Sequence, residues 1–568
     1  MLLSLALIAA VWAGVVFIAW RFPEGAEKWW RWWSHLAAAL SRRRALLFFL
    51  AALLPLLLRG MLLPLWPIPD PYVQDEFSYL LQADTFAHGR LTNPTPALGD
   101  FFESAQILLH PSYTSKYPPG HALVMALGQR LLGHPWFGVW LSCGVLAAAL
   151  LWALEGWFAP SWAIFGTLLA LPLCSFGYWM NSYMGGSVAA IGGALVVGAY
   201  GRLTRQKRER AAWALGAGCV LLVFTRPFEG LLIAIPTLVM CLLARVSPWV
   251  WAKVACIGLV GAAALGYYNH RVTSDALRLP YFEYQAQYLS TPQFNVLLPD
   301  APKRFRYKYM KLLDEVWEHQ QWENARRPRF LVDRPLQWIA AAAMFTGGTG
   351  SFLPLIAVHA SVVDQGAVFN LDNVIHIFLM GAVVLVPLGI FARPLAKGGR
   401  TRFAFVLVAG SVAGSFISAA FYQHYAAPAL AAILVLVTGS YRHLRHARCS
   451  GPMFAALIPL VAIGMSILNG APALLHDPAV LKVATRARLE DTVKEHSGKH
   501  LIIVRYSGVQ RPIEEWVYNG ADLNESEVIW AHDLGPVENR RLASYFHDRQ
   551  VWLFQPNIDA EWIGPYRD

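Results

Sequence analysis

Charged residues are scarce in this chain, and cysteines are few. Of its 568 residues, 15% are Asp, Glu, Lys or Arg and 6 are cysteine, whereas 56% are hydrophobic and the mean hydropathy is +0.40. A soluble domain of this length carries more charge, so the composition excludes a soluble globular protein. We therefore expect a polytopic membrane protein.

Motifs for disulfide, metal and nucleotide chemistry are missing as well. No CxxC pair occurs, and the cysteines fall inside apolar runs except Cys449, which lies in a basic loop. This pattern excludes a disulfide framework. His443 and His446 have one-turn spacing, but their basic neighbours would repel a cation, so a solvated loop is the better interpretation. The polar tail has no glycine-rich phosphate loop, which argues against a nucleotide site there.

Long apolar runs take the place of these motifs. Runs of roughly 17 to 23 apolar residues can cross a bilayer as helices. We predict about a dozen spans, at residues 2–20, 44–66, 136–154, 160–180, 185–201, 211–225, 229–245, 250–268, 374–393, 403–422, 425–440 and 453–470. A further apolar stretch, 335–358, contains GGTG and Pro354, which fits a re-entrant or interfacial hairpin rather than a span, and it is left uncounted.

Basic residues cluster in a subset of the connecting loops. They precede the second run and follow the fifth, ninth and eleventh, as Arg42, Arg43 and Arg44; Arg202, Arg205, Lys207, Arg208 and Arg210; Arg393, Lys397, Arg400 and Arg402; and Arg442, Arg445 and Arg448. Positive residues beside spans stay on the cytoplasmic side. The other face then receives both termini, the loops 67–135 and 269–373, and the tail. The net charge of +11 is thus explained by topology and lipid headgroups, not by nucleic-acid binding.

The chain divides into a membrane body, residues 1–470, and a more polar tail, residues 471–568. The tail contains three short apolar runs, at 501–507, 527–533 and 551–556, separated by helix-like segments. Such alternation predicts a small α/β domain with a mostly parallel sheet. We expect it on the extracytoplasmic side, as a lid or docking platform over the membrane body.

The loop 67–135 has the densest concentration of reactive side chains. Residues 74–87 carry Phe77, Leu80, Leu81 and Phe86 at helical spacing, which predicts an amphipathic helix in the membrane interface. Asp75 and Glu76 fall in its first turn. There a carboxylate either caps the helix end or acts as a base, and the pattern leaves both readings open. Side chains at i and i+1 point to different helix faces, so one base with one supporting acid fits better than a bidentate metal pair.

Lys116 lies in a proline-stiffened turn, KYPPG, further along the same loop. A lysine in such a place either snorkels to lipid phosphates or clamps the phosphate of a substrate.

Together these features resemble the GT-C superfamily of membrane glycosyltransferases, in particular the protein O-mannosyltransferase and lipid A aminoarabinose transferase branch. The resemblance rests on the DEFSYLL helix, the KYPPG turn and the HPWFG segment that precedes alternating spans, and it covers roughly residues 44–440. It implies an all-α polytopic body of GT-C type with about a dozen transmembrane helices. The extra first span, the long loop 269–373 and the α/β tail depart from the better-known relatives.

The resemblance also implies an activity and a location. The activity is an inverting transfer of a sugar from a polyprenyl-phosphate donor to an acceptor hydroxyl, on the extracytoplasmic face of a bacterial inner membrane. The acceptor is left open between protein, lipid and glycan, and so is the assistance of a divalent metal.

The resemblance also implies roles for individual residues of this chain, according to their positions in the motifs. Asp75 would be the general base, and Glu76 would support it or orient the acceptor. Lys116 and Arg226 would contact the donor phosphate, although Arg226 has an alternative partner in Glu229, three residues on. His424 and Tyr425 begin an aromatic and proline-containing segment that would line the donor groove, where a histidine is often only hydrogen-bonded.

Three other classes compete with this interpretation. A transporter needs charged or broken helices at mid-membrane depth, whereas ionisable residues here gather at the outer interface. A lipid-linked glycan polymerase or ligase would share the carrier and the outer-face site. A non-catalytic scaffold would follow if Asp75 only caps its helix.

Overall fold

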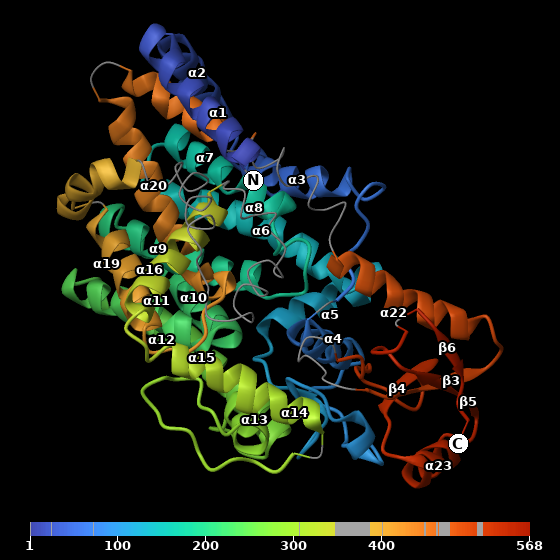
Figure 1. Cartoon of the computed structure of the whole chain (residues 1–568). Coiled ribbons are helices and arrows are strands. Elements are labelled where there is room, and N and C mark those ends of the chain that lie inside the picture. Colours follow the sequence, from blue (N-terminus) through green and yellow to red (C-terminus); the bar gives the residue numbers. More distant parts are fainter. Residues whose placement is uncertain are drawn as a thin grey trace.

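The computed structural model describes residues 2–567 apart from 24, 72, 306, 347–386, 400, 448–449, 462–463, 465–477, 508–514 and 560. Most of the predicted span 374–393, the second half of the stretch 335–358 and the end of the span 453–470 lie outside the described residues. Figure 1 shows a large helical body and a small, sheet-containing tail at its side.

Among the described residues, five helical segments are long and apolar enough to cross a membrane. They are α3 (Arg44–Gly60), α6 (Trp136–Glu155), α9 (Gly186–Arg205), α12 (Pro248–Thr273), and the segment Gln423–Arg445, which joins η4 (Gln423–Ala429) to α20 (Leu430–Arg445). Other helices, mostly apolar, are α1 (Leu2–Arg21), α7 (Pro160–Leu169), α8 (Leu171–Phe176), α10 (Ala211–Thr225), α11 (Pro227–Leu243), α16 (Phe330–Phe345) and α19 (Arg402–Ser415). A mostly helical body is therefore confirmed, while the number of spans stays a prediction.

Two predicted spans differ in detail. The run 160–180 is divided into α7 and α8 at Ala170, two residues before Pro172, because proline lacks the N–H that continues a helix. The run from residue 425 begins as the 3₁₀ helix η4, which contains Pro428. The helix α2 (Ala26–Arg42), which carries four tryptophans, was not predicted.

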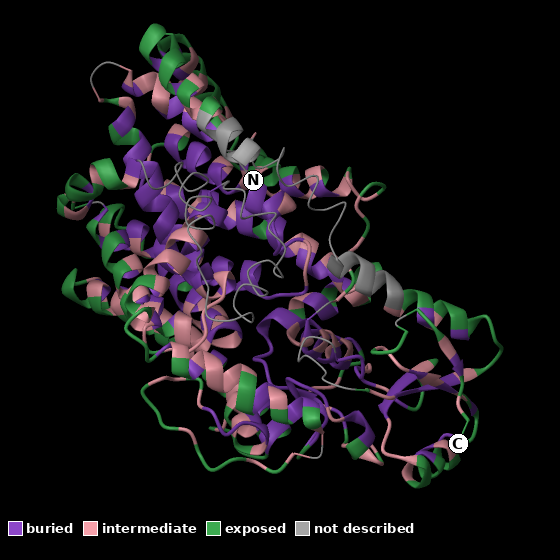
Figure 2. Cartoon of the chain, in the orientation of Figure 1, coloured by how far each residue is buried: buried purple, intermediate pink, exposed green. Residues whose placement is uncertain are grey.

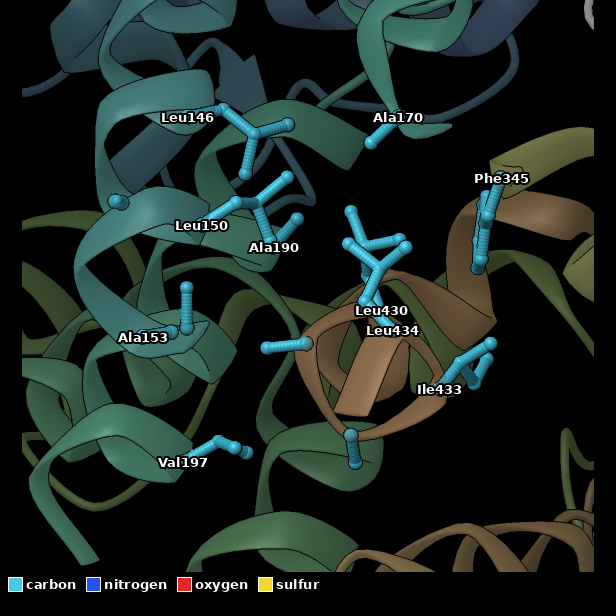
Figure 3. Packing of buried hydrophobic residues seen from close by; sticks show 14 of the residues in the cluster. Leu146, Leu150, Ala153, Ala170, Ala190, Val197, Phe345, Leu430, Ile433 and Leu434 are labelled. Carbon is cyan, nitrogen blue, oxygen red and sulfur yellow. The ribbon is translucent and has the colours of Figure 1, made fainter. Parts of the chain in front are cut away.

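The helices α6, α9 and α20 form the centre of the body. Figure 3 shows Leu146 and Leu150 of α6, Ala190 of α9 and Leu430 and Leu434 of α20 packed together. In the apolar stretch of α9, 83% of the residues are buried, whereas in that of α12 only 11% are. Therefore α9 is an inner helix and α12 an outer one, as Figure 2 also shows.

Two glycines permit close approaches that bear on the site. A Cβ at Gly193 of α9 would lie 2.0 Å from the carbonyl oxygen of Pro428, so only glycine lets η4 rest on this helix. A Cβ at Gly120 would lie 2.7 Å from the carbonyl oxygen of Phe224. Gly120 therefore brings the turn after Lys116 against the end of α10.

The loop 67–135 folds as α4 (Gln74–Ala87), η1 (Gly99–Phe102), the antiparallel strands β1 (Ile107–Leu108) and β2 (Thr114–Ser115), and α5 (Gly120–Leu132). The predicted helix over residues 74–87 is confirmed. The long loop that follows α12 contains α13 (Pro280–Tyr288), α14 (Lys308–Leu312), the π-helix η2 (Leu313–Glu318) and α15 (His319–Asn324).

The tail contains α22 (Pro478–Lys494), β3 (Lys499–Val504), β4 (Val528–His532), α23 (Pro536–Tyr545), β5 (Arg549–Phe554) and β6 (Ile563–Pro565). The sheet order is β4-β3-β5-β6. The central β3 pairs parallel to β4 and β5, and β6 is antiparallel. The three apolar runs are thus confirmed as strands of a mostly parallel sheet.

The tail packs directly on α4 (Figure 1). The ring of Phe77 stacks on Tyr518 with centroids 4.3 Å apart, and Asp84 Oδ2 accepts the Ala521 backbone N–H at 2.8 Å. Arg90, just beyond α4, donates to both carboxylate oxygens of Asp522 at 2.8 and 2.7 Å. Phe77 and Leu81 therefore contact protein instead of the membrane interface that their spacing predicted, because the tail covers their side of the helix.

Candidate active site

A cavity of about 170 Å³ lies between α4, the turn after β2, the start of α11, η2 and η4. Five of the residues that line it carry charge: Asp75, Lys116, Arg226, Glu229 and Glu318. His424 and Tyr425 also line it. Five of the six predicted site residues therefore meet in one cavity, although they come from segments far apart in the chain.

Asp75 reaches the cavity from the first turn of α4. The N-terminal end of a helix favours a negative charge, so this position suits an ionised carboxylate. The Tyr117 hydroxyl donates a hydrogen bond to Asp75 Oδ1, which fixes the orientation of the carboxyl group. Asp75 is half-buried, so one side of it faces the cavity.

Glu76 points elsewhere and is buried. Its Oε2 accepts the Val73 backbone N–H at 3.1 Å, and its Oε1 accepts the backbone N–H of Tyr183 at 2.8 Å. It does not belong to the cavity lining. The structure thus differs from the predicted support of Asp75 or contact with an acceptor, because adjacent helix positions face different directions. We infer that Glu76 positions α4 against the segment before α9.

Lys116 is buried beneath three tyrosine rings. Its Nζ lies 5.3 Å from the ring centroid of Tyr117, 5.6 Å from that of Tyr281 and 4.8 Å from that of Tyr284. Such rings attract a cation with their negative faces. Burial lowers the pKa of Lys116, whereas the nearby carboxyl groups of Asp75 and Glu318 raise it. The ammonium group is therefore held among groups of opposite charge, inside the cavity.

Arg226 connects α10 and α11 and is also buried. Its guanidinium lies over the ring of Tyr425, 4.6 Å from the centroid. Arg226 therefore contacts the aromatic wall of the cavity, and its predicted alternative partner Glu229 lies in the first turn of α11. Arg226 and Lys116 together place two cations on the cavity wall.

His424 and Tyr425 belong to an aromatic cluster on η4. His424 stacks on Tyr422 with centroids 5.8 Å apart and planes at 9°, and its ring meets that of Tyr425 edge-on at 4.9 Å. Tyr425 in turn contacts the Arg226 guanidinium. Both residues line the cavity, and their contacts hold the aromatic wall in place beside the cations.

Glu318 is a charged lining residue that the sequence analysis missed. It ends the π-helix η2, a form that often marks functional sites. Buried Asp314 anchors this helix, since its carboxylate accepts the Ser290 N–H and hydroxyl at 2.9 and 2.6 Å. Burial raises the pKa of Glu318 to about 7; Lys116 lowers it, while Asp75 and Asp314 raise it further. The only signal in the sequence was a short acidic stretch, DEVWE, within an otherwise basic loop.

A second, apolar groove of about 820 Å³ adjoins the cavity. It runs along α10 and α12 and is lined mainly by small and aliphatic residues, including Gly258, Gly261 and Gly266. Leu279 lines both the groove and the charged cavity. A charged cavity and an apolar groove that share a wall suit an amphipathic ligand. Within the described part of the chain, no group of three or more His, Cys, Asp and Glu side chains has an arrangement that could hold a metal ion.

No family model and no curated protein matches this chain, whereas several solved structures do, among them two of ArnT. ArnT from Cupriavidus metallidurans in the apo state is 14% identical, with 91% of this chain and 94% of that chain covered and a TM-score of 0.47. ArnT from the same organism bound to undecaprenyl phosphate is 14% identical, with 80% and 72% covered and a TM-score of 0.41. ArnT belongs to the GT-C branch that the sequence motifs resemble.

Proposed function

We propose that this protein is a GT-C glycosyltransferase that moves a sugar from a polyprenyl-phosphate donor to an acceptor hydroxyl, with inversion at the sugar. The observation that carries the proposal is the junction at Leu279, where the charged cavity meets the apolar groove. A polyprenyl phosphate has the matching chemistry, with an anionic head and a long apolar chain. A transporter substrate or a scaffold would not require this pairing.

The two cations supply the contact to the donor phosphate. Lys116 and Arg226 both line the cavity, one from the turn after β2 and one from the turn before α11. Charge-assisted hydrogen bonds to phosphate are strong, and fixed cations stabilise the charge that develops on a departing phosphate. The aromatic wall of His424 and Tyr425 completes this side of the site.

Asp75 supplies the base. Its carboxylate accepts the proton of the acceptor hydroxyl while the acceptor oxygen bonds to the anomeric carbon and the bond from that carbon to the phosphate oxygen breaks. The electron pair of the broken bond stays on the polyprenyl phosphate, which leaves as an anion beside Lys116 and Arg226. The Tyr117 hydroxyl keeps the Asp75 carboxylate in one orientation during this step.

The lipid that co-purifies with the protein provides the first test. Mass spectrometry of that lipid should identify a polyprenyl phosphate or its sugar ester, and added undecaprenyl phosphate should bind to the purified full-length protein. The proposal would be contradicted if the co-purified lipid were of another class and the protein did not bind undecaprenyl phosphate.

A transfer assay then separates the related classes. The protein is incubated with labelled undecaprenyl-phosphate mannose and undecaprenyl-phosphate aminoarabinose, in a membrane extract that supplies acceptors. A single transfer supports the proposal. Growth of a chain from the label would instead indicate a lipid-linked glycan polymerase or ligase.

A further inference from the structure

The charges that line the cavity do not balance. Three carboxyl groups, those of Asp75, Glu229 and Glu318, face two cations, Lys116 and Arg226. A donor phosphate adds another negative charge to this enclosed space. With all three carboxyl groups ionised, three carboxylates and one phosphate would face two cations, and such an excess of like charge in a confined site is costly. A neutral carboxyl group reduces this excess, so we expect one of the three to carry a proton when the donor is bound.

The surroundings of the three carboxyl groups indicate which one it is. Asp75 accepts a hydrogen bond from Tyr117 at a helix N-terminus, which favours its ionised form. Glu229 lies in the first turn of α11, where the helix N-terminus also supports a negative charge, although burial opposes it. Glu318 has neither support. It shares Lys116 with Asp75, and Asp314 lies on its own helix.

We propose that Glu318 recognises the donor phosphate as a neutral carboxylic acid, taking up one proton from solvent and donating it as a hydrogen bond to a phosphate oxygen. The inference rests on the proposed function, since it needs a phosphate beside Lys116. It assigns a ligand-binding task to a residue of the long loop that departs from the better-known relatives.

Other titratable and charged groups surround Glu318 on every packed element. They are Asp75 of α4, Lys116 after β2, Arg226 and Glu229 at the start of α11, Tyr284 of α13, Asp314 of its own helix, and Tyr422, His424 and Tyr425 of η4. Only a group that changes charge near neutral pH can couple donor binding to pH there. Burial raises the pKa of Glu318 to about 7, which meets this condition. Histidine is also a residue type that titrates in this range, so the variant Glu318→Gln is needed to separate Glu318 from His424.

The coupling has a definite sign. Below pH 7 Glu318 already carries its proton, so donor affinity should not depend on this group. Above pH 7 the proton must be taken up on binding, so affinity should fall by up to about tenfold for each pH unit. An ordinary glutamate, with a pKa of roughly 4.3, would be ionised at every pH in this range. It would then take up a proton on donor binding at every pH, so affinity would fall over the whole range and not only above pH 7.

The experiment measures the Kd of farnesyl methyl phosphate, a phosphodiester whose single negative charge is constant, from roughly pH 6 to pH 9. It uses the full-length protein in detergent and the variants Glu318→Gln, Lys116→Arg and Glu315→Gln. Glu315 is exposed on the same helix and is the matched control. Thermal melting of each variant verifies folding.

The wild type, Lys116→Arg and Glu315→Gln should lose affinity above pH 7, whereas Glu318→Gln should bind equally at all pH values, near the low-pH wild-type affinity. If the slope persists in Glu318→Gln, another group titrates and the inference is wrong; loss of the slope in Lys116→Arg would then identify the lysine. A flat wild-type profile also overturns it but leaves the proposed function intact. Absence of binding at every pH would overturn both.

Discussion

The Tyr117 hydroxyl donates a hydrogen bond to Asp75, and the same tyrosine ring lies 5.3 Å from the Lys116 ammonium. One side chain thus touches both the predicted base and the predicted phosphate ligand. The hydroxyl contacts Asp75 and the ring contacts Lys116, so a substitution that removes only the hydroxyl tests one contact without the other.

Tyr117→Phe keeps the ring beside Lys116 and removes only the hydrogen bond. We expect donor affinity to stay unchanged and the transfer rate to fall roughly two- to tenfold, because one net hydrogen bond is worth about 0.5–1.5 kcal/mol. Donor titration and single-turnover transfer on the same preparation measure both quantities. A loss of donor affinity with an unchanged rate would show that the hydroxyl serves the phosphate instead.

The apolar groove is tested by filling it. A Cβ at Gly258 meets nothing within 4 Å, so Gly258→Leu should fit the fold and occupy the groove. We expect weaker binding of undecaprenyl phosphate and unchanged binding of inorganic phosphate. Gly410→Leu on α19, where a Cβ also meets nothing within 4 Å, is the matched control. Equal binding of undecaprenyl phosphate by both variants would exclude this groove as the site of the isoprenoid chain.

Glu318 should also affect stability, with a sign that follows from its pKa. The pKa of Glu318 is raised to about 7 in the folded protein, whereas a glutamate in the unfolded chain has a pKa of roughly 4.3. Between these two pH values the folded state binds more protons than the unfolded state, so the free energy of unfolding decreases as the pH rises. Glu318→Gln should therefore melt at a higher temperature than the wild type at pH 8 and at a similar temperature near pH 4. Melting curves without donor measure this difference, and a lower melting temperature at pH 8 would contradict the raised pKa.

The location of the site on the extracytoplasmic face stays a prediction from the basic loops. Ser112 of the outer loop is buried, so we choose Leu277, which is 92% exposed, and Ser507 for cysteine substitution. Both cysteines should react with an impermeant reagent in intact cells, and a cysteine at exposed Lys207 should not. The background variant lacks native cysteines, because Cys256 is exposed. The reverse labelling pattern would move the site to the cytoplasm.

Some of the site could be predicted from the sequence because it lies in short motifs. Asp75, Lys116 and Arg226 lie in the short proline-containing segments PDPYVQDE, KYPPG and TRPFEG between apolar segments, and such positions indicate interface residues without any tertiary information. Glu318 could not be found in this way. Its place in the cavity depends on the π-helix η2 and on the hydrogen bonds by which Asp314 anchors that helix. No local sequence periodicity predicts either feature.

The tail gives the complementary lesson. Its strands were predictable from short apolar runs, but its docking on α4 was not, because Phe77 and Leu81 have the spacing of a membrane-facing helix. The contacts with Tyr518 and Asp522 show that the tail holds the helix that carries Asp75. Glu76 lies outside the cavity for a related reason. Its bond to the Val73 N–H follows the local spacing of a helix start, but its bond to the Tyr183 N–H joins segments that sequence spacing does not connect.

The most direct test of the central claim is the transfer rate of Asp75→Asn. Asparagine keeps the size of the side chain and offers an amide oxygen to the Tyr117 hydroxyl. General base catalysis predicts a variant with wild-type melting temperature and donor affinity but a transfer rate lower by roughly 100- to 10,000-fold. A variant that transfers sugar at nearly the wild-type rate would contradict the account, because Asp75 would then serve only as a negative charge in the first turn of its helix.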